Sequence, residues 1–460
     1  MCWNHITSNS LFAARYIDEN MLFETAAPAV FFDDEDLLYY IIGYLNTPCA
    51  NIILKLINPT MCTNVGDITS QPLIIKDQFT KDQVIKAVKR NIQLSSQDWN
   101  SFEPSLYFRS NFVSHNLNRI SNAYENWKSS VNDLFNEIKA NEEKINSAFI
   151  NTYSLAEEAN WRVDRKNVTV HYIVDELSSV ESDDIRGNQY LLNRSDVVKQ
   201  FISYVIGCMF GRYSLDVDGL VYAGGDWDDS KYKTFLPDAD NVIPITDEEY
   251  LDDDIVGRFV QFVKVVYGEQ TLEENLTFIA DALGGKGKSS REVIRNYFLK
   301  DFFKDHCKTY QKRPIYWLYD SGKQNGFKAL VYLHRMDENT TGKVRADYLH
   351  RIEQIYGNEV IRMQDVIDHD KSAHQVSLAE KRMDKLKKQI KECQDYDAKL
   401  GHLALDQIKL NLDDGVKVNY RKAQTGRDGK FYEVLADSKN IMANDALWKE
   451  YLTEWPHEEE

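Results

Sequence analysis

The sequence predicts a helix-rich α+β protein made of several domains. Its 460 residues are enough for about two to four domains of ordinary size. Hydrophobic residues account for 43% of the chain, so a sizeable core can form. Long stretches with apolar residues at every third or fourth position alternate with short strand-like runs bounded by Gly, Pro and Asn.

Residues 1–78 are predicted to form a small mixed α/β domain. The short runs "LFAARYI" and "PAVFF" are typical of strands, and they precede the helix-like stretch "DEDLLYYIIGYLN". Asp33 or Asp34 can cap that helix. The stretch "INPTMCTNVGDITSQPLII" then has the composition of a loop that leads to a short apolar strand.

Residues 79–160 are predicted to form a long helical spacer. The segment "TKDQVIKAVKRNI" can begin at a Thr80 cap. The long polar stretch that follows has apolar residues at spacings of three and four, which is typical of one or two amphipathic helices.

Residues 161–335 are predicted to form a mixed α/β domain. The strand-like "NVTVHYIV" and the helix-like "SDVVKQFISYVIGCMF" come first. An acidic segment and helices at 250–267, 272–283 and 289–310 follow them. The domain closes with a hairpin in which "PIYWLYD" and "FKALVYL" flank the turn "SGKQNG". The first of these strands is apolar on both faces, so its aromatic rings are expected in a core.

Residues 336–460 are predicted to form a helical C-terminal region. Within it, Met383, Leu386, Ile390 and Cys393 are spaced by three and four residues. That spacing predicts an amphipathic or coiled-coil arm.

The charge is distributed unevenly along a chain whose net charge is −17. Residues 214–256 carry 13 acidic and 2 basic residues, and are expected to face solvent or a basic protein. Residues 286–313 carry 9 basic and 3 acidic residues, and this excess of cations suits contact with nucleic-acid phosphates. The candidate DNA-binding cations of this region and of the hairpin are Lys286, Lys288, Arg291, Arg295, Lys312, Arg313, Lys323 and Lys328.

Several motif-like stretches fail on inspection. "LGGKGKSSREVI" lacks the first glycine of a phosphate-binding loop, since position 282 is Ala, and no strand precedes it. It is expected to be a flexible loop that leads to Ser289 or Ser290 as a helix cap. "INPTM" lacks the second proline and the aromatic ring of the Asn-Pro-Pro-aromatic tetrad of amino-methyltransferases. No glycine-rich strand–loop–helix opening suited to S-adenosylmethionine is found.

Metal-dependent chemistry finds little support either. Asp133, Glu137 and Lys139 match the letters of a nuclease motif, but their segment has the pattern of one solvated helix. His369 and His374 are five residues apart, a spacing that does not place both on one helix face. Neither group is therefore interpreted as a metal site.

Longer stretches resemble the C-terminal half of PglX, the family of adenine-specific DNA methyltransferases of BREX phage-defence systems. They are "CMFGRYSLD", "GLVYAGGDWDD", "DDDIVGRF" and "IRNYFLKDFFKDHCKTYQKRPIYWLYDSGKQNGFKALVYLHR". "NSLFAARY" and "LINPTMCTNVGDITSQPLII" resemble the family's target-recognition domain. The resemblance implies that residues 1–78 recognise the DNA target and that Arg15 is the best candidate for reading a guanine.

The same resemblance implies what this chain lacks. In the family, a Rossmann-type domain with the cofactor and catalytic motifs precedes the recognition domain, and Met1 is expected to lie where that domain ends. No catalytic residue can therefore be carried over. S-adenosylmethionine is expected in a separate or missing methyltransferase half, and the chain alone is expected to be inert. The implied partners are double-stranded DNA, that methyltransferase half and other BREX proteins.

Two other functions remain open on the sequence alone. The chain could be a protein–protein scaffold of the defence complex, or, with less support, an independent nuclease. A cytoplasmic protein without a membrane segment is expected, because the apolar run "LLYYIIGYL" is too short to span a bilayer. The N-terminus also lacks the cationic and apolar regions of a signal peptide.

Overall fold

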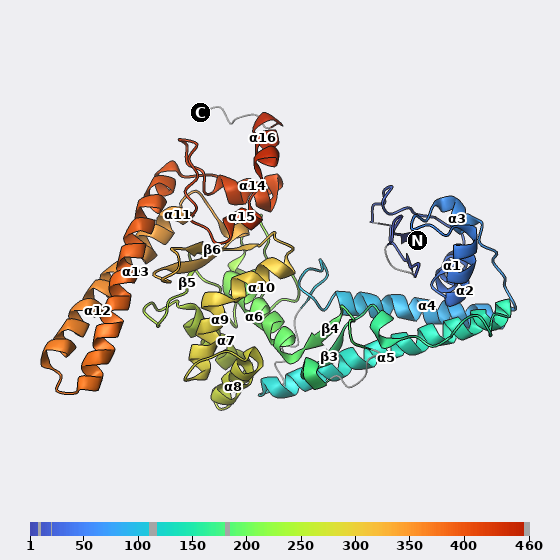
Figure 1. Ribbon diagram of the computed structural model, residues 1–460, viewed down its shortest axis with the longest axis horizontal. Helices are drawn as coiled ribbons and strands as arrows, with labels where there is room; N and C mark the ends of the chain where they lie inside the picture. The colour runs from blue at the N-terminus through green and yellow to red at the C-terminus, as the bar shows by residue number, and fades with distance from the viewer. Residues whose placement is uncertain (8–10, 20, 110–116, 180–184, 455–460) are drawn as a thin grey trace. The chain divides into compact units, whose positions relative to one another are not determined.

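The computed structural model describes residues 1–7, 11–19, 21–109, 117–179 and 185–454. The chain divides into two compact units (Figure 1). Unit 1 contains Met1–Ser101 and Glu125–Arg194, and unit 2 contains Phe102–Tyr124 and Ser195–Glu460. The prediction of a helix-rich, multidomain α+β fold is confirmed.

The first part of unit 1 has very little sheet. The strands β1 (Cys2–Trp3) and β2 (Ala14–Arg15) form a two-residue antiparallel ladder, and "PAVFF" contributes only an isolated bridge between Ala29 and Cys2. Asp34 caps the first helix, as predicted, by accepting hydrogen bonds from two backbone amides. The helices here are α1 (Glu35–Leu45), α2 (Pro48–Ile57) and α3 (Val65–Thr69).

Two long helices, α4 (Gln78–Trp99) and α5 (Ile120–Tyr153), form the predicted spacer. Asp77 rather than Thr80 caps α4, because the Asp77 carboxylate accepts the backbone N–H of Thr80 at 2.8 Å. The α4 and α5 helices are not a separate layer, since the core of residues 1–78 continues onto them. Phe149 of α5, for example, packs its ring 5.2 Å from that of Tyr40.

The last part of unit 1 packs on α5. A second cluster surrounds the buried ring of Phe135, where Val168 and Val170 contact the helix. The strands β3 (Tyr172–Val174) and β4 (Leu191–Asn193) pair in parallel. The strand expected from "NVTVHYIV" is therefore shorter than predicted. Two short 3-10 turns, Arg165–Asn167 and Leu177–Ser179, connect these segments.

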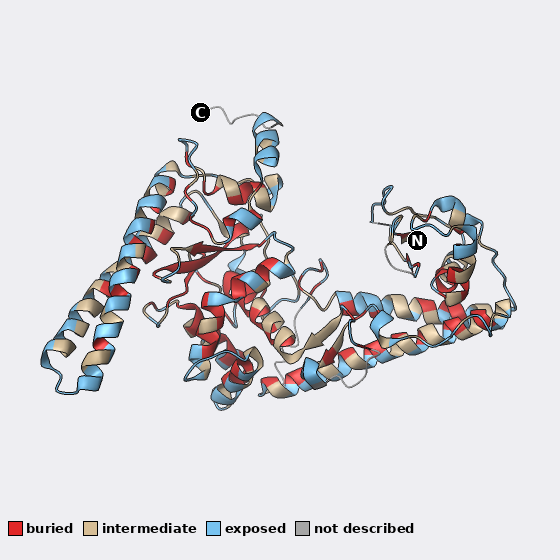
Figure 2. Cartoon of the chain, in the orientation of Figure 1, coloured by how far each residue is buried: buried red, intermediate tan, exposed pale blue. Residues whose placement is uncertain are grey.

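Unit 2 is built around a three-stranded antiparallel sheet in the order β5-β7-β6. The predicted hairpin is present and supplies two of its strands, β6 (Tyr316–Asp320) and β7 (Lys328–Tyr332). The rings of Tyr316, Trp317 and Tyr319 are all buried, which confirms that the hairpin aromatics belong to the core. Figure 2 shows the sheet as one of the most completely buried parts of the chain. The third strand is β5 (Val242–Pro244).

The helices of unit 2 follow the sequence prediction closely up to residue 309. The prediction of one helix over 289–310 is corrected, because α9 ends at Lys300 and a new helix begins two residues later. The elements are α6 (Arg194–Phe210), a 3-10 turn (Asp229–Lys231), α7 (Ile255–Tyr267), α8 (Leu272–Leu283), α9 (Ser290–Lys300) and α10 (Phe302–Thr309).

The C-terminal region contains the predicted amphipathic arm. The helices α12 (His350–His369) and α13 (Ala373–Asp406) lie side by side as a helical hairpin (Figure 1). Leu386 and Cys393 are buried at the spacing that predicted the arm. The remaining elements are η4 (Leu333–Arg335), α11 (Thr340–Lys343), the π-helical turn η5 (Val344–Leu349), η6 (Leu412–Asp414), α14 (Gly415–Lys422), α15 (Ser438–Ile441) and α16 (Asp445–Glu454).

None of the helices in the described ranges can by itself span a membrane. The pair α1 and α2 passes that test of length and composition when taken together, but the two helices meet at an angle of 80°. Much of this pair is buried in the core of unit 1. The pair is therefore explained by the packing of unit 1.

Candidate nucleic-acid interface

The nine cations named from the sequence fall into two groups. Arg295 and Lys328 are buried, with 8% of each residue exposed. The others are exposed, namely Arg15, Lys286, Lys288, Arg291, Lys312, Arg313 and Lys323. A cation must be accessible to contact a phosphate or a base, so only the exposed group can contribute to a DNA-binding surface.

Arg295 belongs to a buried ion pair. Its guanidinium forms two parallel bonds with the carboxylate of Asp254, at 2.7 and 2.8 Å, and a third with the carbonyl oxygen of Thr246. Asp254 has no exposed surface, and it also caps α7 through the backbone N–H of Val256. Arg295 is thus committed to joining α9 and α7, and we leave it out of any DNA-contacting surface.

Lys328 is also committed to internal contacts. Its ammonium lies 2.9 Å from the Asp320 carboxylate on the neighbouring strand and donates to the carbonyl oxygen of Leu299 at 3.3 Å. The sequence placed this lysine at the rim of the hairpin. The structure places it inside, because β7 runs between β5 and β6 as the central strand.

In the glycine-rich loop before α9, neighbouring side chains already accept the backbone amides at the start of the helix. Ser289 caps the helix, as predicted, by accepting the backbone N–H of Glu292 at 3.2 Å. Glu292 in turn accepts the backbone N–H of Lys288 at 2.7 Å. This reciprocal capping occupies donors that a phosphate would need. Arg291 is held by Glu273 through two bonds of 2.6 and 2.8 Å, so Lys286 and Lys288 are the exposed lysines of this loop without an ion pair among the described contacts.

Exposed cations lie on α10 and on the residues that flank it, and three of them, Lys300, Lys304 and Lys308, are not among the cations named from the sequence. Lys304 and Lys308 belong to α10, Lys300 is the last residue of α9, and Lys312 and Arg313 follow α10. Lys300, Lys304, Lys308 and Lys312 follow one another at intervals of four residues, and all four are exposed. The opposite face of α10 is buried through Phe303 and Cys307, among others. With a rise of about 6 Å per four helical residues, Lys304 and Lys308 lie on the same side of the helix. We call Lys300, Lys304, Lys308, Lys312 and Arg313 the α10 ridge.

The ridge is anchored to the sheet by a neutral histidine. His306 Nε2 accepts the backbone N–H groups of Ile315 and Tyr316, each at 3.1 Å. Burial, together with the charge of Arg212, lowers the pKa of His306 to about 3. The imidazole therefore fixes the position of α10 without adding charge. The four-residue spacing of these lysines was visible in the sequence, although only Lys304 and Lys308 share one helix.

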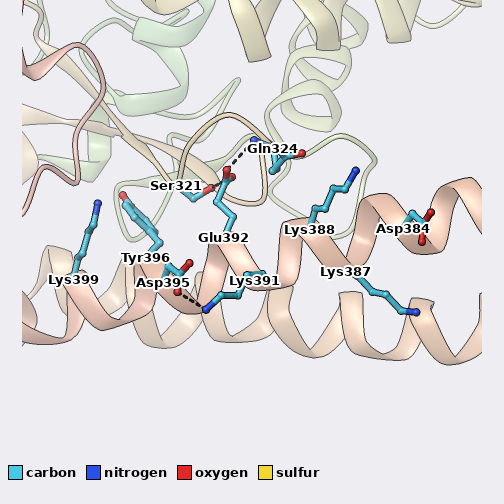
Figure 3. Close-up of a pocket in the computed structure, with 10 residues that line it drawn as sticks. All are labelled: Ser321, Gln324, Asp384, Lys387, Lys388, Lys391, Glu392, Asp395, Tyr396 and Lys399. Carbon is cyan, nitrogen blue, oxygen red and sulfur yellow. Dashed lines mark hydrogen bonds and ion pairs between the residues drawn. The ribbon is translucent and has the colours of Figure 1, made fainter.

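A second cationic surface lies on the arm. Its groove has a volume of about 710 Å³ and lies between α13 and the β6–β7 turn (Figure 3). Glu392 fixes the two walls together, because its carboxylate accepts the Ser321 hydroxyl and the backbone amides of Gln324 and Gly326. The lining residues are Ser321, Gln324, Asp384, Lys387, Lys388, Lys391, Glu392, Asp395, Tyr396 and Lys399.

This groove has a mixed charge. Its four lysines face three carboxylates, and one of the lysines, Lys391, pairs with Asp395 at 2.7 Å. A net charge of about one cation is a weak attraction for a polyanion. The α10 ridge is the stronger candidate for binding a polyanion. It has five cations, and among the contacts of the described residues only Lys304 forms an ion pair, a weak one with Asp301 at 3.5 Å.

Arg15 is exposed on β2, but part of its donor capacity is used locally. Its Nη1 donates to the carbonyl oxygen of Ala14 at 3.0 Å and approaches Asn46 Oδ1 at 3.5 Å. Burial raises the pKa of the Glu142 carboxyl to about 7, and the charge of Arg15 opposes that shift. Arg15 thus has a structural role in unit 1, and base reading by this residue stays a prediction.

The acidic segment 214–256 is only partly directed to solvent. Asp254 pairs with Arg295, and Asp247 lies 2.8 Å from Arg382 and 2.5 Å from Lys385 of the arm. The expectation that this segment faces solvent or a partner is therefore wrong for these two aspartates. Their charge compensates basic residues of the same unit.

Three carboxylates of the same segment crowd together instead. Tyr348 donates its hydroxyl to Asp240 and Asp253, and the nearly buried Asp238 lies beside them. Burial, then the hydrogen bond and charge of Asp240, raise the pKa of Asp238 to about 7. Among the described residues, no group of three or more His, Cys, Asp and Glu side chains has the geometry of a metal site.

The motif-like stretches rejected on sequence have structural roles. Asn58 donates to the carbonyl oxygen of Cys62 and to Asp67, while its own carbonyl accepts the amide and hydroxyl of Thr60. Its side chain is thus fully used in shaping the loop. In α5, Glu137 pairs with Arg90. The solvated-helix interpretation of that segment is confirmed.

The comparisons with known proteins show that the chain is similar to part of two proteins named adenine-specific methyltransferases. It is 40% identical over 431 residues to the adenine-specific methyltransferase PglX of Lacticaseibacillus casei (strain Zhang), a match that covers 92% of this chain. It is 35% identical over 454 residues to the adenine-specific methyltransferase BrxX of Escherichia coli O9:H4 (strain HS), covering 95% of this chain. No family model matches the chain.

The matches cover only 34% and 36% of these relatives. The chain therefore spans about a third of the length of the curated relatives it matches. It corresponds to a C-terminal portion of PglX-type proteins, and the resemblance predicted from the sequence is confirmed.

Proposed function

We propose that this chain is the DNA-contacting portion of a BREX-type adenine-N6 methyltransferase, and that it holds the duplex for a catalytic portion that lies outside it. The observation that carries the proposal is the 40% identity to PglX over 92% of the chain. An enzyme that methylates adenine must extrude the base from the duplex, and a large surface that grips the backbone supports that step.

The α10 ridge is the proposed phosphate-binding surface. Its five cations would neutralise phosphates without reading the sequence, which gives affinity and register but no specificity. Lys286, Lys288 and Lys323 would add to it as further exposed charges. Target reading, which the resemblance assigns to residues 1–78, is proposed for unit 1 with Arg15 as the candidate base contact.

The cofactor is proposed to bind elsewhere. S-adenosylmethionine would be held by the catalytic portion, and the chain described here would contribute no group to its chemistry. Isothermal titration of the purified chain with S-adenosylmethionine is expected to give no saturable heat, and a micromolar site would contradict this part of the proposal.

The test of DNA contact is the salt dependence of binding. The triple variant Lys300→Ala, Lys304→Ala and Lys308→Ala is expected to bind a fluorescent 30-base-pair duplex more weakly. Each lost phosphate contact should flatten the slope of log K against log salt by about 0.9, so the triple variant should lose about 2 to 3 units. Fluorescence anisotropy at several salt concentrations measures both quantities.

The matched control removes three lysines from other exposed positions of unit 2. Lys371→Ala, Lys409→Ala and Lys449→Ala change the net charge by the same amount. They should leave the slope almost unchanged, because long-range effects are screened beyond about 10 Å at 0.1 M salt. Equal slopes for both variants, or no binding by the unmodified chain at low salt, would contradict the assignment of the ridge.

A scaffold function is the second candidate, and one observation favours it. Residues 16–36 carry seven acidic residues and no basic ones, which does not suit a DNA-binding surface. The two functions differ when unit 1 is exchanged for that of a relative. Because its core includes α4 and α5, the exchange must span residues 1–194.

The readout is the methylated motif once the chimaera is combined with a catalytic portion. A reader would change the motif, since each base contact contributes about 1–3 kcal/mol of discrimination. A scaffold would change only the yield of the complex. Sequencing that detects N6-methyladenine distinguishes the two results.

A further inference from the structure

Unit 1 presents an apolar face that its own core does not cover. Four large exposed side chains lie in the segment before α1, three of them consecutive and the fourth at position 31. The exposed fractions are 53% for Met21, 99% for Leu22, 54% for Phe23 and 66% for Phe31. Phe23 and Phe31 contact each other with ring centroids 5.2 Å apart, so they form one cluster. We call these four residues the N-terminal apolar face.

The segment that leads to Phe31 is paired with the backbone of the N-terminus. The chain from Met1 to His5 lies alongside Ala26 to Val30, since Trp3 N–H donates to the carbonyl oxygen of Pro28 and Val30 N–H donates to that of Met1. The side chain of Trp3 is buried beneath, with its indole N–H bonded to the carbonyl oxygen of Thr63. Phe31 therefore follows an ordered backbone, and such a residue loses little entropy when a partner binds.

Acidic residues flank the apolar face along the chain. Residues 16–36 contain Asp18, Glu19, Glu24 and four consecutive acidic positions at 33–36, with no Lys or Arg. Asp34 is used as the α1 cap and Asp36 pairs with Lys89 at 3.0 Å. The negative charge of the other positions repels a phosphate backbone and an anionic membrane surface alike.

An apolar centre with an acidic rim fits a protein surface that has an apolar centre and a basic rim. We infer that the N-terminal apolar face is the docking site for the portion of the methyltransferase that lies outside this chain, through a basic and apolar surface of that portion. The inference rests on the proposed function, because it takes the relatives' remaining length as the partner. About two thirds of each relative lies outside the matched stretch, which is ample to supply such a surface.

The inference is tested with two purified proteins. The first is the full chain, and the second is the portion of the Lacticaseibacillus casei PglX that the match does not cover. Biolayer interferometry should show a complex. The variant Leu22→Ser, Phe23→Ser should weaken it at least tenfold, because large apolar anchors dominate protein interfaces. The variant Glu19→Lys, Glu24→Lys should weaken it as well, mainly through slower association at low salt.

The matched control is Leu405→Ser, at a leucine of unit 2 that is 84% exposed. It should leave the complex unchanged. Both sets of substitutions are at exposed positions, so the fold should tolerate them, and circular dichroism verifies this.

Each remaining outcome overturns the inference in an identifiable way. Absence of a complex with the unmodified chain, or equal affinity of the Leu22→Ser, Phe23→Ser variant, shows that the face does not dock this partner. Loss of duplex affinity with retention of the protein complex shows an apolar wedge for DNA instead. A dimer of the unmodified chain that the same variant dissociates, measured by light scattering, shows that a second copy covers the face. In all these cases the salt slope of the ridge variant still tests the proposed function separately.

Discussion

Replacing Arg295 with methionine tests whether this arginine stabilises the fold or binds DNA. The charge counts of the sequence place Arg295 among the cations that would meet DNA, whereas the structure pairs it with the fully buried Asp254. Methionine keeps a similar length and removes the guanidinium. The variant is therefore expected to destabilise unit 2 while leaving the α10 ridge chemically intact.

The magnitude follows from what the substitution leaves behind. Asp254 would lose both bonds to the guanidinium while staying buried. Breaking a buried ion pair on one side typically costs about 3–5 kcal/mol. Asp254 keeps the amides of Val256 and Gly257 as partners, so the lower part of this range is expected. At roughly 2–4 °C per kcal/mol for a mid-sized domain, the Tm of unit 2 should fall by about 6–12 °C.

Thermal unfolding followed by tryptophan fluorescence suits the assay, because Trp317, on strand β6 of unit 2, is fully buried. The matched control is Arg291→Met on the same helix. Arg291 forms an equally good pair with Glu273, but both side chains are exposed, so its loss should cost at most about 1 kcal/mol. Duplex affinity should be measured below the transition temperature of each variant.

Two results would refute this reasoning. A Tm for Arg295→Met within about 2 °C of that for Arg291→Met would show that burial does not set the cost of losing this pair. A folded Arg295→Met variant with a flatter salt slope would show that Arg295 contacts phosphates. The double variant Arg295→Met, Asp254→Leu gives a further check, since removing both charges should recover part of the lost stability.

Two further predictions concern the sheet and the acidic segment of unit 2. The pKa of Asp238 is raised to about 7, so the stability that this carboxyl contributes is present below pH 4 and is lost as the pH rises through 7. Asp238→Asn should not suffer this loss. Its free energy of unfolding relative to that of the unmodified chain should therefore increase progressively between pH 4 and 8, by no more than about 4 kcal/mol. Asp216→Asn is its control with the opposite sign, because hydrogen bonds outweigh burial and lower the pKa of Asp216. If urea titrations give a difference in the free energy of unfolding between Asp238→Asn and the unmodified chain that does not change with pH, the prediction is contradicted. Gly326→Ala should destabilise unit 2 by about 1–3 kcal/mol, since its Cβ would lie 2.8 Å from the backbone oxygen of Gln389, whereas Gly357→Ala, in open space on α12, should be neutral or stabilising; equal Tm values for the two variants would contradict the crowding argument.

The sequence was informative wherever the signal was local and periodic. The limits of α8 and the cap of α9 at Ser289 follow from apolar spacing and capping chemistry, which act within a few residues. The buried hairpin followed from a strand that is apolar on both faces. The kinship with PglX followed from long stretches of shared sequence. The predicted cap of α4 at Thr80 was wrong because Asp77 also carries a suitable side-chain oxygen, and only the path of the chain determines which of the two caps the helix.

The site itself depends on contacts between distant segments, which charge counts along the chain cannot detect. Arg295 and Asp254 are 41 residues apart, and Asp247 meets Lys385 across 138 residues. In each case a basic and an acidic segment that looked like opposite surfaces neutralise each other inside one unit. The cost of burying an unpaired charge forces such pairing, and it removes residues from the surface that sequence reasoning had placed there.

By itself, then, the sequence determined the class of fold, the helices and hairpin of unit 2, and the relationship to adenine-specific methyltransferases. Only the tertiary structure decided which cations remain accessible: it removed Arg295 and Lys328 from the candidate DNA surface and added Lys300, Lys304 and Lys308 beside Lys312 and Arg313. It also placed Met21, Leu22, Phe23 and Phe31 outside the core. The physical reason is the same in both cases: secondary structure forms from neighbours along the chain, whereas exposure is determined by what the rest of the fold packs against each side chain.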